Sequence, residues 1–241
     1  LFILRDLTEM KRLQAELHRH ERLTALGNLA AGVAHEIRNP LSSIKGLATF
    51  IAKKMQPEGR EEEAARTMIQ EVNRLNQVVT ELLEFATPSS VKLSATDVNA
   101  LITHALKLAQ ADLVSKDIQV KFNPEEPLPK MFVNPERLTQ ALLNLFLNAV
   151  QAMDSGGILD IQVEARSDGQ FAIIISDNGQ GMSKETLSSI FTPYFTTKSS
   201  GTGLGLAIVH EIVEGHGGTI GVSSTEGTGS VFTLLFPAQN L

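Results

Sequence analysis

The fold of this chain is organised by one stretch, Gly32-Val33-Ala34-His35-Glu36-Ile37-Arg38-Asn39-Pro40-Leu41. Around it, apolar residues recur at spacings of three and four, which is typical of one buried stripe on a helix. The stripe consists of Leu26, Ala30, Val33, Ile37, Leu41, Ile44, Ala48, Ile51 and Met55. Because a helix turns by about 100° per residue, His35 lies about 200° from Val33. We therefore expect the imidazole of His35 on the solvent side of the helix.

Three polar residues in this stretch could form a reactive site: His35, Glu36 and Asn39. Neutral imidazole is a good nucleophile near its unperturbed pKa of about 6.5, and an adjacent carboxylate can accept its proton. Glu36 is placed for that role, and the amide of Asn39, one turn further on, could orient a water molecule. Pro40 should bend the helix here because it cannot donate to the carbonyl of Glu36. The alternative is an exposed histidine on a charged helix face.

The first 90 residues are predicted to contain two long helices. The first extends from Glu9 to about Met55, and a turn at 56–59 separates it from a second apolar stripe. That stripe consists of Ala65, Met68, Val72, Leu75, Val79, Leu82 and Ala86. A proline and two serines at 87–90 then mark a linker. Two such helices make half a core, so we expect two copies to form a dimeric four-helix bundle. A hairpin packed on the second domain is the alternative.

The composition restricts the class of protein. The chain has 241 residues, of which 42% are hydrophobic and 20% charged, and its formal net charge is -6. This charge gives no general attraction to nucleic acid or to an anionic membrane. The sequence has no cysteine and no run of about 18 apolar residues, so we expect no thiolate metal site and no membrane span. Since it starts at Leu1 rather than at a methionine, we interpret it as a fragment that could reach a membrane only through segments upstream.

After the linker the pattern changes to mixed α and β. Apolar residues follow the helical period in three segments, and they alternate or form short runs in five others. The expected helices are 97–115, 135–153 and 204–216, and the expected strands are 118–122, 157–164, 171–176, 219–224 and 230–236. This order predicts a second domain of the mixed α/β class.

Two asparagines in the expected helix 135–153 are candidates for binding a metal ion. Asn144 and Asn148 are four residues apart, so their side chains share one face of the helix. Amide oxygens are hard ligands suited to Mg²⁺, which commonly keeps waters and bridges substrate phosphates. Asparagine is otherwise mildly unfavourable within a helix. The alternative is a structural pair whose hydrogen bonds are satisfied within the protein.

Three further motifs follow in a fixed order. Asp177-Asn178-Gly179-Gln180-Gly181 comes directly after an expected strand, where a carboxylate can accept from an exocyclic amine and glycines let a flat ring approach the backbone. Lys198 ends the run Phe191-Thr192-Pro193-Tyr194-Phe195-Thr196-Thr197-Lys198 and could neutralise a terminal phosphate. It precedes Gly201-Thr202-Gly203-Leu204-Gly205 and a helix, whose amides and positive dipole end favour phosphate. The last motif is Gly227-Thr228-Gly229, before a strand that carries Thr233.

These motifs fit neither a dinucleotide-binding fingerprint nor a P-loop, because no strand directly precedes Gly201 and no G-K-[ST] follows it. Taken together, they resemble the Bergerat-type ATP-binding domain shared by histidine kinases, Hsp90-type chaperones, type II topoisomerases and MutL. The resemblance covers residues 95–237, in the order of that domain's N, G1, F, G2 and G3 boxes.

The resemblance implies an α/β sandwich that binds ATP and Mg²⁺. Asn148 would bind Mg²⁺ with support from Asn144, and Asp177 would hold the adenine amine with help from Thr233. The segment 180–202 would be a lid, with Lys198 near the γ-phosphate. The other residues that would line the nucleotide are Gly179, Gly181, Gly203, Leu204 and Gly205.

The run His35-Glu36-Ile37-Arg38-Asn39-Pro40-Leu41 resembles the phosphoacceptor box of sensor histidine kinases. With the ATP-binding motifs, it makes nearly the whole chain similar to the transmitter core of that family, and in particular to its NtrB- and ZraS-type group. The resemblance implies autophosphorylation of His35 and transfer to an aspartate of a response-regulator receiver domain. It also implies a phosphatase reaction in which Asn39 positions water. Hydrolysing Bergerat families carry a glutamate at the position of Asn144, so here ATP should be held without rapid hydrolysis.

The resemblance divides the chain into three parts. Residues 1–20 would be a signalling helix or linker from an upstream sensory domain, residues 21–90 the dimerisation and histidine phosphotransfer domain, and residues 91–241 the catalytic ATP-binding domain. The apolar start followed by Asp6-Leu7-Thr8 resembles the exit of a PAS domain, and a chance helix cap is the alternative. The implied location is the cytoplasmic portion of a bacterial inner-membrane sensor.

Two other functions stay open from the sequence. A chaperone-like or repair-type ATPase would use nucleotide-driven lid closure to rearrange its dimer without phosphohistidine. A coiled-coil scaffold would retain a degenerate nucleotide fold.

Overall fold

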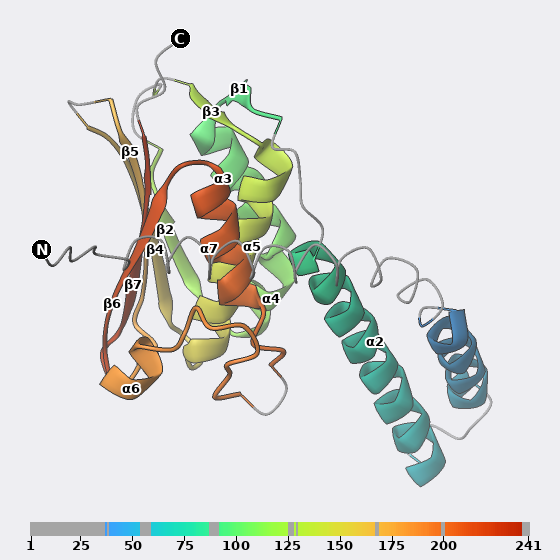
Figure 1. Ribbon diagram of the computed structural model, residues 1–241. Helices are drawn as coiled ribbons and strands as arrows, with labels where there is room; N and C mark the ends of the chain where they lie inside the picture. Colours follow the sequence, from blue (N-terminus) through green and yellow to red (C-terminus); the bar gives the residue numbers. More distant parts are fainter. Residues whose placement is uncertain are drawn as a thin grey trace, which may run out of the picture. The chain divides into compact units, whose positions relative to one another are not determined.

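The computed structural model describes residues 37, 39–53, 59–86, 92–124, 128, 130–166, 169–198 and 201–237. It divides the chain into two compact units, Leu1–Ser89 and Ser90–Leu241 (Figure 1). The predicted signalling helix over 1–20, with its PAS-like start, lies outside the described residues. No helix in the described part of the chain combines the length and the apolar character needed to cross a membrane.

Two helical segments make up the described part of the first unit: residues 39–53 and α2 (Arg60–Ala86). Three glutamates in the first turn of α2 favour its start, since carboxylates stabilise the positive end of a helix. Both segments bury a narrow stripe at a spacing of seven, which consists of Leu41, Ala48, Ala65, Val72 and Val79. Other residues of the predicted stripes are exposed, namely Ile37, Ile44, Ile51, Met68 and Leu75. The single chain therefore leaves apolar helix surface uncovered.

The second unit is built on a five-stranded sheet in the order β2-β4-β5-β7-β6. The strands are β2 (Gln119–Phe122), β4 (Ile158–Ala165), β5 (Phe171–Asp177), β7 (Gly229–Phe236) and β6 (Thr219–Thr225). β2 and β4 are parallel, and the other neighbours are antiparallel. The helices α3 (Val98–Leu108), α5 (Pro135–Ala152) and α7 (Gly205–Gly215) lie on one face of this sheet (Figure 1). The unit is an α/β sandwich, as predicted.

The sequence of α5 determines both its start and its two faces. Asn134 caps the helix by accepting a hydrogen bond from the Arg137 N–H at 3.0 Å, and Pro135 occupies the first turn, where no N–H is needed. The buried face consists of Leu138, Ala141, Leu142, Leu145, Phe146, Ala149 and Val150. Asn144 and Asn148 are half-buried at the edge of this face. The helix thus presents two amides at the border of the core.

His216 joins the end of α7 to the start of α5. Its Nε2 accepts a hydrogen bond from the Asn134 N–H at 2.9 Å, so the ring hydrogen must be on Nδ1, which lies 2.7 Å from the carbonyl oxygen of Ile212. The ring is buried and meets the ring of Phe236 edge-on. This bond links α7, which begins at Gly205, to α5, which carries Asn144 and Asn148.

The second unit differs from the sequence prediction in its short elements. β1 (Ser94–Thr96) and β3 (Met131–Val133) pair antiparallel and were not predicted, because three residues are too few to show alternation. The predicted helix 97–115 is two helices, α3 and α4 (Gln110–Ser115), which meet at Ala109. A further short helix, α6 (Lys184–Leu187), lies in the predicted lid.

Candidate functional site

Of the three residues predicted for the reactive site, the structure describes Asn39, whereas His35 and Glu36 lie outside the described residues. Asn39 lies in the helical segment 39–53 with its side chain exposed, and its carbonyl oxygen accepts a hydrogen bond from Ser43 Oγ at 3.3 Å. An exposed amide is open to water and to a docking partner. The role of Asn39 in orienting water stays a prediction.

The amide predicted to bind metal and the lysine predicted to bind phosphate are in direct contact. The Lys198 ammonium donates hydrogen bonds to Asn148 Oδ1 at 2.9 Å and to Gln151 Oε1 at 2.6 Å. Burial lowers the pKa of Lys198, and the positive charge of Lys116 lowers this pKa further. Lys116 is itself held at the end of α5, where its ammonium donates to the carbonyl oxygen of Val150 at 2.9 Å. Two lysines thus bring positive charge to the C-terminal half of α5.

Gln151 is a site residue that the motifs did not reveal. Asn144, Asn148 and Gln151 are spaced by four and three residues, so all three lie on one face of α5, and the sequence shows this shared face but not the contact of Gln151 with Lys198. Asn144 Nδ2 donates to the carbonyl oxygen of Gly205 at 3.3 Å. A Cβ atom at Gly205 would lie 3.8 Å from Asn148 Nδ2, so the start of α7 lies against the two asparagines.

In the predicted phosphate-binding motif before α7, the backbone requires a glycine at position 203. Gly203 has a φ of +71°, and a Cβ atom there would lie 2.5 Å from the carbonyl carbon of Tyr194. Leu204 is buried, and its N–H donates to Thr202 Oγ1 at 3.3 Å. α7 then begins at Gly205 without a hydrogen bond from a capping side chain. Its first N–H groups can therefore bind an anion.

Asp177 ends β5 with a half-buried carboxylate. Its Oδ1 accepts a hydrogen bond from the Gly179 N–H at 2.9 Å. Burial raises the pKa of Asp177 above its usual range, and hydrogen bonds from the backbone N–H groups of Gly179 and Ser230 act in the opposite direction. An ionised carboxylate has about four acceptor positions. Asp177 therefore keeps the capacity to accept a further hydrogen bond from an exocyclic amine.

Two glycines let the loop after β5 pack closely on neighbouring backbone. A Cβ atom at Gly179 would lie 2.5 Å from the carbonyl oxygen of Ala152, the last residue of α5. Gly181 has a φ of +66°, and a Cβ atom there would overlap the carbonyl oxygen of Thr225 at the end of β6. The Gln180 N–H donates to the carbonyl oxygen of Ala152 at 2.9 Å. The loop is thus bonded to the last turn of the helix that carries the amides.

Ser230, rather than Thr233, lies beside Asp177. The strand register pairs Asp177 with Ser230, and it pairs Ile174 with Thr233. Paired residues share a face and successive residues alternate, so Thr233 lies on the opposite face of the sheet from Asp177. Ser230 is buried, and its hydroxyl oxygen lies 3.1 Å from that of Ser224 on β6. The prediction that Thr233 assists Asp177 is therefore wrong, and Ser230 takes its place beside the carboxylate.

The residues present fit a magnesium ion that arrives with a nucleotide. Among the described residues, no three His, Cys, Asp or Glu side chains gather as a metal site of their own. Asn148 Oδ1 already accepts from a cation, the Lys198 ammonium, so this oxygen faces a position that suits positive charge. Mg²⁺ prefers oxygen ligands, which include carbonyl oxygens, and it usually keeps several waters while it binds substrate phosphates. The metal-binding role of Asn148 stays a prediction.

The chain matches two family models. Residues 25–90 match the His Kinase A (phospho-acceptor) domain, and residues 133–240 match the histidine kinase-, DNA gyrase B-, and HSP90-like ATPase. The chain is 51% identical over 235 residues to sensor histidine kinase ZraS of Escherichia coli (strain K12), which covers 98% of this chain and 50% of that protein. The chain spans about half the length of the curated relatives it matches.

Two solved structures of histidine kinases are similar to this chain in fold. Full-length ShkA, in complex with AMPPNP, has a TM-score of 0.75 at 25% identity, covering 90% of this chain and 47% of that chain. Histidine kinase ThkA, in complex with response regulator protein TrrA, has a TM-score of 0.68 at 28% identity, covering 98% of this chain and 68% of that chain. By its two family matches, its relatives and its fold, the chain belongs to the sensor histidine kinases, as a transmitter core in which a phosphoacceptor domain is followed by a Bergerat-type ATP-binding domain.

Proposed function

We propose that this core transfers the γ-phosphoryl group of ATP to His35 and then to an aspartate of a response regulator. The ATP-binding part of the proposal rests on one observation: α5 contacts both the loop after Asp177 and the side chain of Lys198. The loop that follows Asp177 is bonded to Ala152 in the last turn of α5, and Asn148, one turn earlier, is bonded to Lys198. An acceptor for an exocyclic amine and a cationic group for phosphate are therefore positioned by one rigid element.

The proposed transfer follows from the residues of this chain. A ring nitrogen of His35 attacks the γ-phosphorus and forms an N–P bond, while the bond from that phosphorus to the β,γ-bridging oxygen breaks and ADP leaves with its electron pair. Glu36 accepts the proton from the other ring nitrogen. Asn148, with support from Asn144, would hold Mg²⁺, which supplies charge neutralisation at the phosphates. Lys198 would add positive charge near the γ-phosphate.

Asn144 favours transfer to histidine over hydrolysis. Activation of water at this position would need a carboxylate as general base, whereas an amide is not a base. The Nδ2 of Asn144 is moreover occupied as a donor to the carbonyl oxygen of Gly205 at 3.3 Å. Bound ATP should therefore persist until His35 reaches it.

The proposal includes two protein partners. A second copy of the chain would cover the exposed stripe residues of the first unit and complete a four-helix bundle. A response-regulator receiver domain would accept the phosphoryl group, in line with the ThkA–TrrA complex. Nucleic acid is not an expected partner, since the net charge is -6. The proposed location is the cytoplasmic portion of a bacterial inner-membrane sensor, as the family resemblance implies.

The proposal also assigns a phosphatase role to Asn39. The exposed amide would orient a water molecule whose oxygen bonds to the phosphorus of the receiver's aspartyl phosphate, while the bond from phosphorus to the aspartate oxygen breaks. We expect Asn39→Ala to lose dephosphorylation of the receiver and to keep phosphorylation of His35. An unchanged rate of dephosphorylation would remove this role.

Steady-state ATP hydrolysis separates the kinase from the ATPase alternative. Release of inorganic phosphate should be slow in the wild type with Mg²⁺ and slow in His35→Ala, because neither provides a base that activates water. His35→Ala should still bind ADP, since the nucleotide site is in the other unit. Rapid hydrolysis that survives His35→Ala would instead favour a Bergerat ATPase that works by dimer rearrangement.

A further inference from the structure

Lys198 is held by two neutral oxygens on one face of α5. Its ammonium lies 2.9 Å from Asn148 Oδ1 and 2.6 Å from Gln151 Oε1. The two acceptors are three positions apart, so their side chains are neighbours on the helix surface. Hydrogen bonds from an ionised donor are stronger than those between neutral groups. The half-buried position of Lys198 also reduces competition from water.

We infer that Gln151 is a positioning residue that holds Lys198 on Asn148, and that Lys198 and the divalent cation exchange at Asn148 Oδ1 when nucleotide binds. This inference rests on the proposed function for the assignment of the cation to Asn148. The ammonium occupies one of the two acceptor positions of that oxygen and places a positive charge 2.9 Å from it. Two cations cannot both lie close to one amide oxygen without strong mutual repulsion. Nucleotide binding with Mg²⁺ should therefore displace Lys198.

Gln151 determines where Lys198 goes after the exchange. A lysine side chain has a long flexible stem with three donors. Lys198 can therefore release Asn148 and stay bonded to Gln151, three residues closer to the end of α5. From there its charge remains beside the face of α5 that carries the proposed phosphate end of the site. Gln151 therefore stabilises the state before nucleotide binding more than the state after it, because only in the former is one ammonium held by both oxygens.

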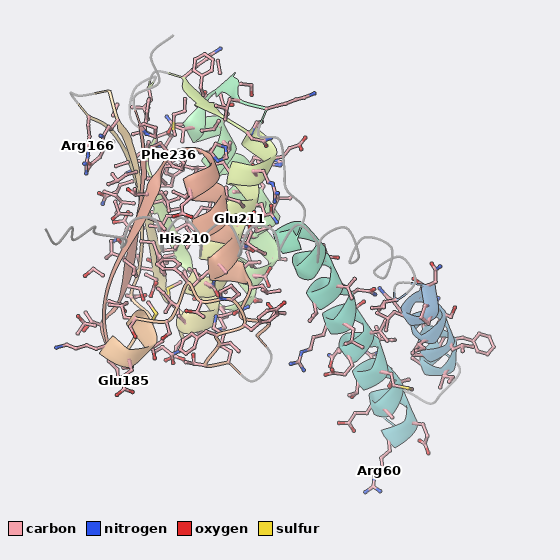
Figure 2. All side chains as sticks on the ribbon, in the orientation of Figure 1. Arg60, Arg166, Glu185, His210, Glu211 and Phe236 are labelled. Carbon is pink, nitrogen blue, oxygen red and sulfur yellow. The ribbon has the colours of Figure 1, made fainter. Side chains whose placement is uncertain are left out.

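The two bonds also tie the connection between α6 and α7 to α5. Glu185 on α6 and His210 on α7 mark the helices that this connection joins (Figure 2). Nearer α6, the connection is held by a ring contact between Phe191 and His210, with ring centroids 5.2 Å apart. Loss of the bonds to Lys198 should therefore loosen the connection around Lys198 more than around Phe191.

Four proteins test the inference: the wild type, Gln151→Leu, Lys198→Met and the double variant. Without nucleotide, amide hydrogen exchange over 194–198 should be faster in both single variants. The ligand in the binding test is ADP with Mg²⁺, which has no γ-phosphate. Gln151→Leu should bind it about threefold to tenfold more tightly than the wild type does, because a smaller fraction of the variant has Lys198 bonded to Asn148. The predicted increase in ADP affinity is modest because the Gln151 side chain is exposed. In the Lys198→Met background, Gln151→Leu should change neither quantity.

Two further variants separate positioning from a general effect on the fold. Gln151→Glu keeps an acceptor oxygen and adds a negative charge, so it should hold Lys198 more firmly and slow the exchange over 194–198 below the wild-type rate. Gln119→Leu replaces an exposed glutamine on β2, at the edge of the sheet, and should leave exchange and ADP affinity unchanged. Opposite effects of Gln151→Leu and Gln151→Glu are not expected from a merely structural residue.

Unchanged exchange over 194–198 in both single variants would overturn the inference. An effect of Gln151→Leu that is equally large with and without Lys198 would do the same. Failure of the proposed function has a different signature, because a wild type that binds neither ADP nor AMPPNP contradicts the ATP site itself. In that case the exchange measurements still decide whether Gln151 holds Lys198.

Discussion

Asp177 and Ser230 face each other across β5 and β7, at the end of the ladder where the loop after β5 begins. The backbone N–H of Ser230 supports the carboxylate of Asp177, and the Ser230 hydroxyl lies 3.1 Å from that of Ser224. Ser224 Oγ in turn accepts a hydrogen bond from the Met182 N–H at 2.9 Å. The proposed adenine-binding carboxylate therefore lies beside a pair of hydroxyls, buried in Ser230 and half-buried in Ser224, that links β6, β7 and the loop after β5.

We expect Ser230→Ala to weaken ADP binding about fivefold, since the loss of one buried hydrogen bond costs about 1 kcal/mol. Thr233→Val is the matched control, because Thr233 lies on the opposite face of the sheet and should leave the affinity unchanged. Isothermal titration with ADP and Mg²⁺ measures both. A larger loss in Thr233→Val than in Ser230→Ala would show that the register does not determine which hydroxyl matters.

Asp177→Asn should lower ADP affinity by about tenfold or more, because a hydrogen bond to a charged acceptor contributes about 1.5–3 kcal/mol. The amide keeps one oxygen to accept from the Gly179 N–H, so the loop should retain its shape. The same titration gives the affinity, and a circular dichroism spectrum checks the fold. Wild-type affinity in this variant would exclude Asp177 as the residue that recognises adenine.

The same substitution should change how stability depends on pH. Burial raises the pKa of Asp177, so the folded protein binds the proton more tightly than the unfolded chain does. The resulting stabilisation is present below the ordinary carboxyl pKa and is lost as the pH rises through the raised pKa. Asp177→Asn lacks this loss, so its stability relative to the wild type should increase from about pH 4 to about pH 7. Urea unfolding without nucleotide measures the difference, and an equal difference at both pH values would contradict it.

Gly181→Ala should destabilise the second unit by about 2 kcal/mol or more, because it combines a left-handed backbone with an overlap between two atoms. Gly181 has a φ of +66°, and its Cβ atom would meet the carbonyl oxygen of Thr225. Gly221→Ala on β6 is the control, since a Cβ atom there would meet nothing within 4 Å. Thermal unfolding should show a lowered midpoint for the first variant alone. Equal midpoints would mean that the loop adapts without cost.

Much of the fold could be predicted from the sequence because its signals are local. In the first unit, the apolar stripes indicated helix over the described residues 39–53 and 60–86, where Leu41, Ala48, Ala65, Val72 and Val79 are buried as expected. The predicted part of the first helix before residue 37 lies outside the described residues. In the second unit, alternating apolar residues and short apolar runs indicated all five strands of the main sheet. The small β1–β3 sheet was missed because each of its strands has only three residues.

Two features of the site could not be predicted because they depend on long-range geometry. Ser230 and Thr233 are both hydroxyl residues on one strand, and only the register with β5 shows which of them faces Asp177. Gln151 belongs to no recognised motif, and its contact with Lys198 joins residues 47 positions apart. The sequence shows that Gln151 shares a helix face with Asn144 and Asn148, but it does not show that Gln151 contacts Lys198.

The account depends most directly on whether His35 receives the γ-phosphoryl group. The measurement is incubation of the protein with γ-labelled ATP and Mg²⁺, followed by acid and base treatment of the labelled protein. We predict a label that is labile in acid and stable in base, and that is absent from a His35→Gln variant which still binds ADP. A label of the same kind in His35→Gln, or no label in a wild type that binds ATP, would contradict the account.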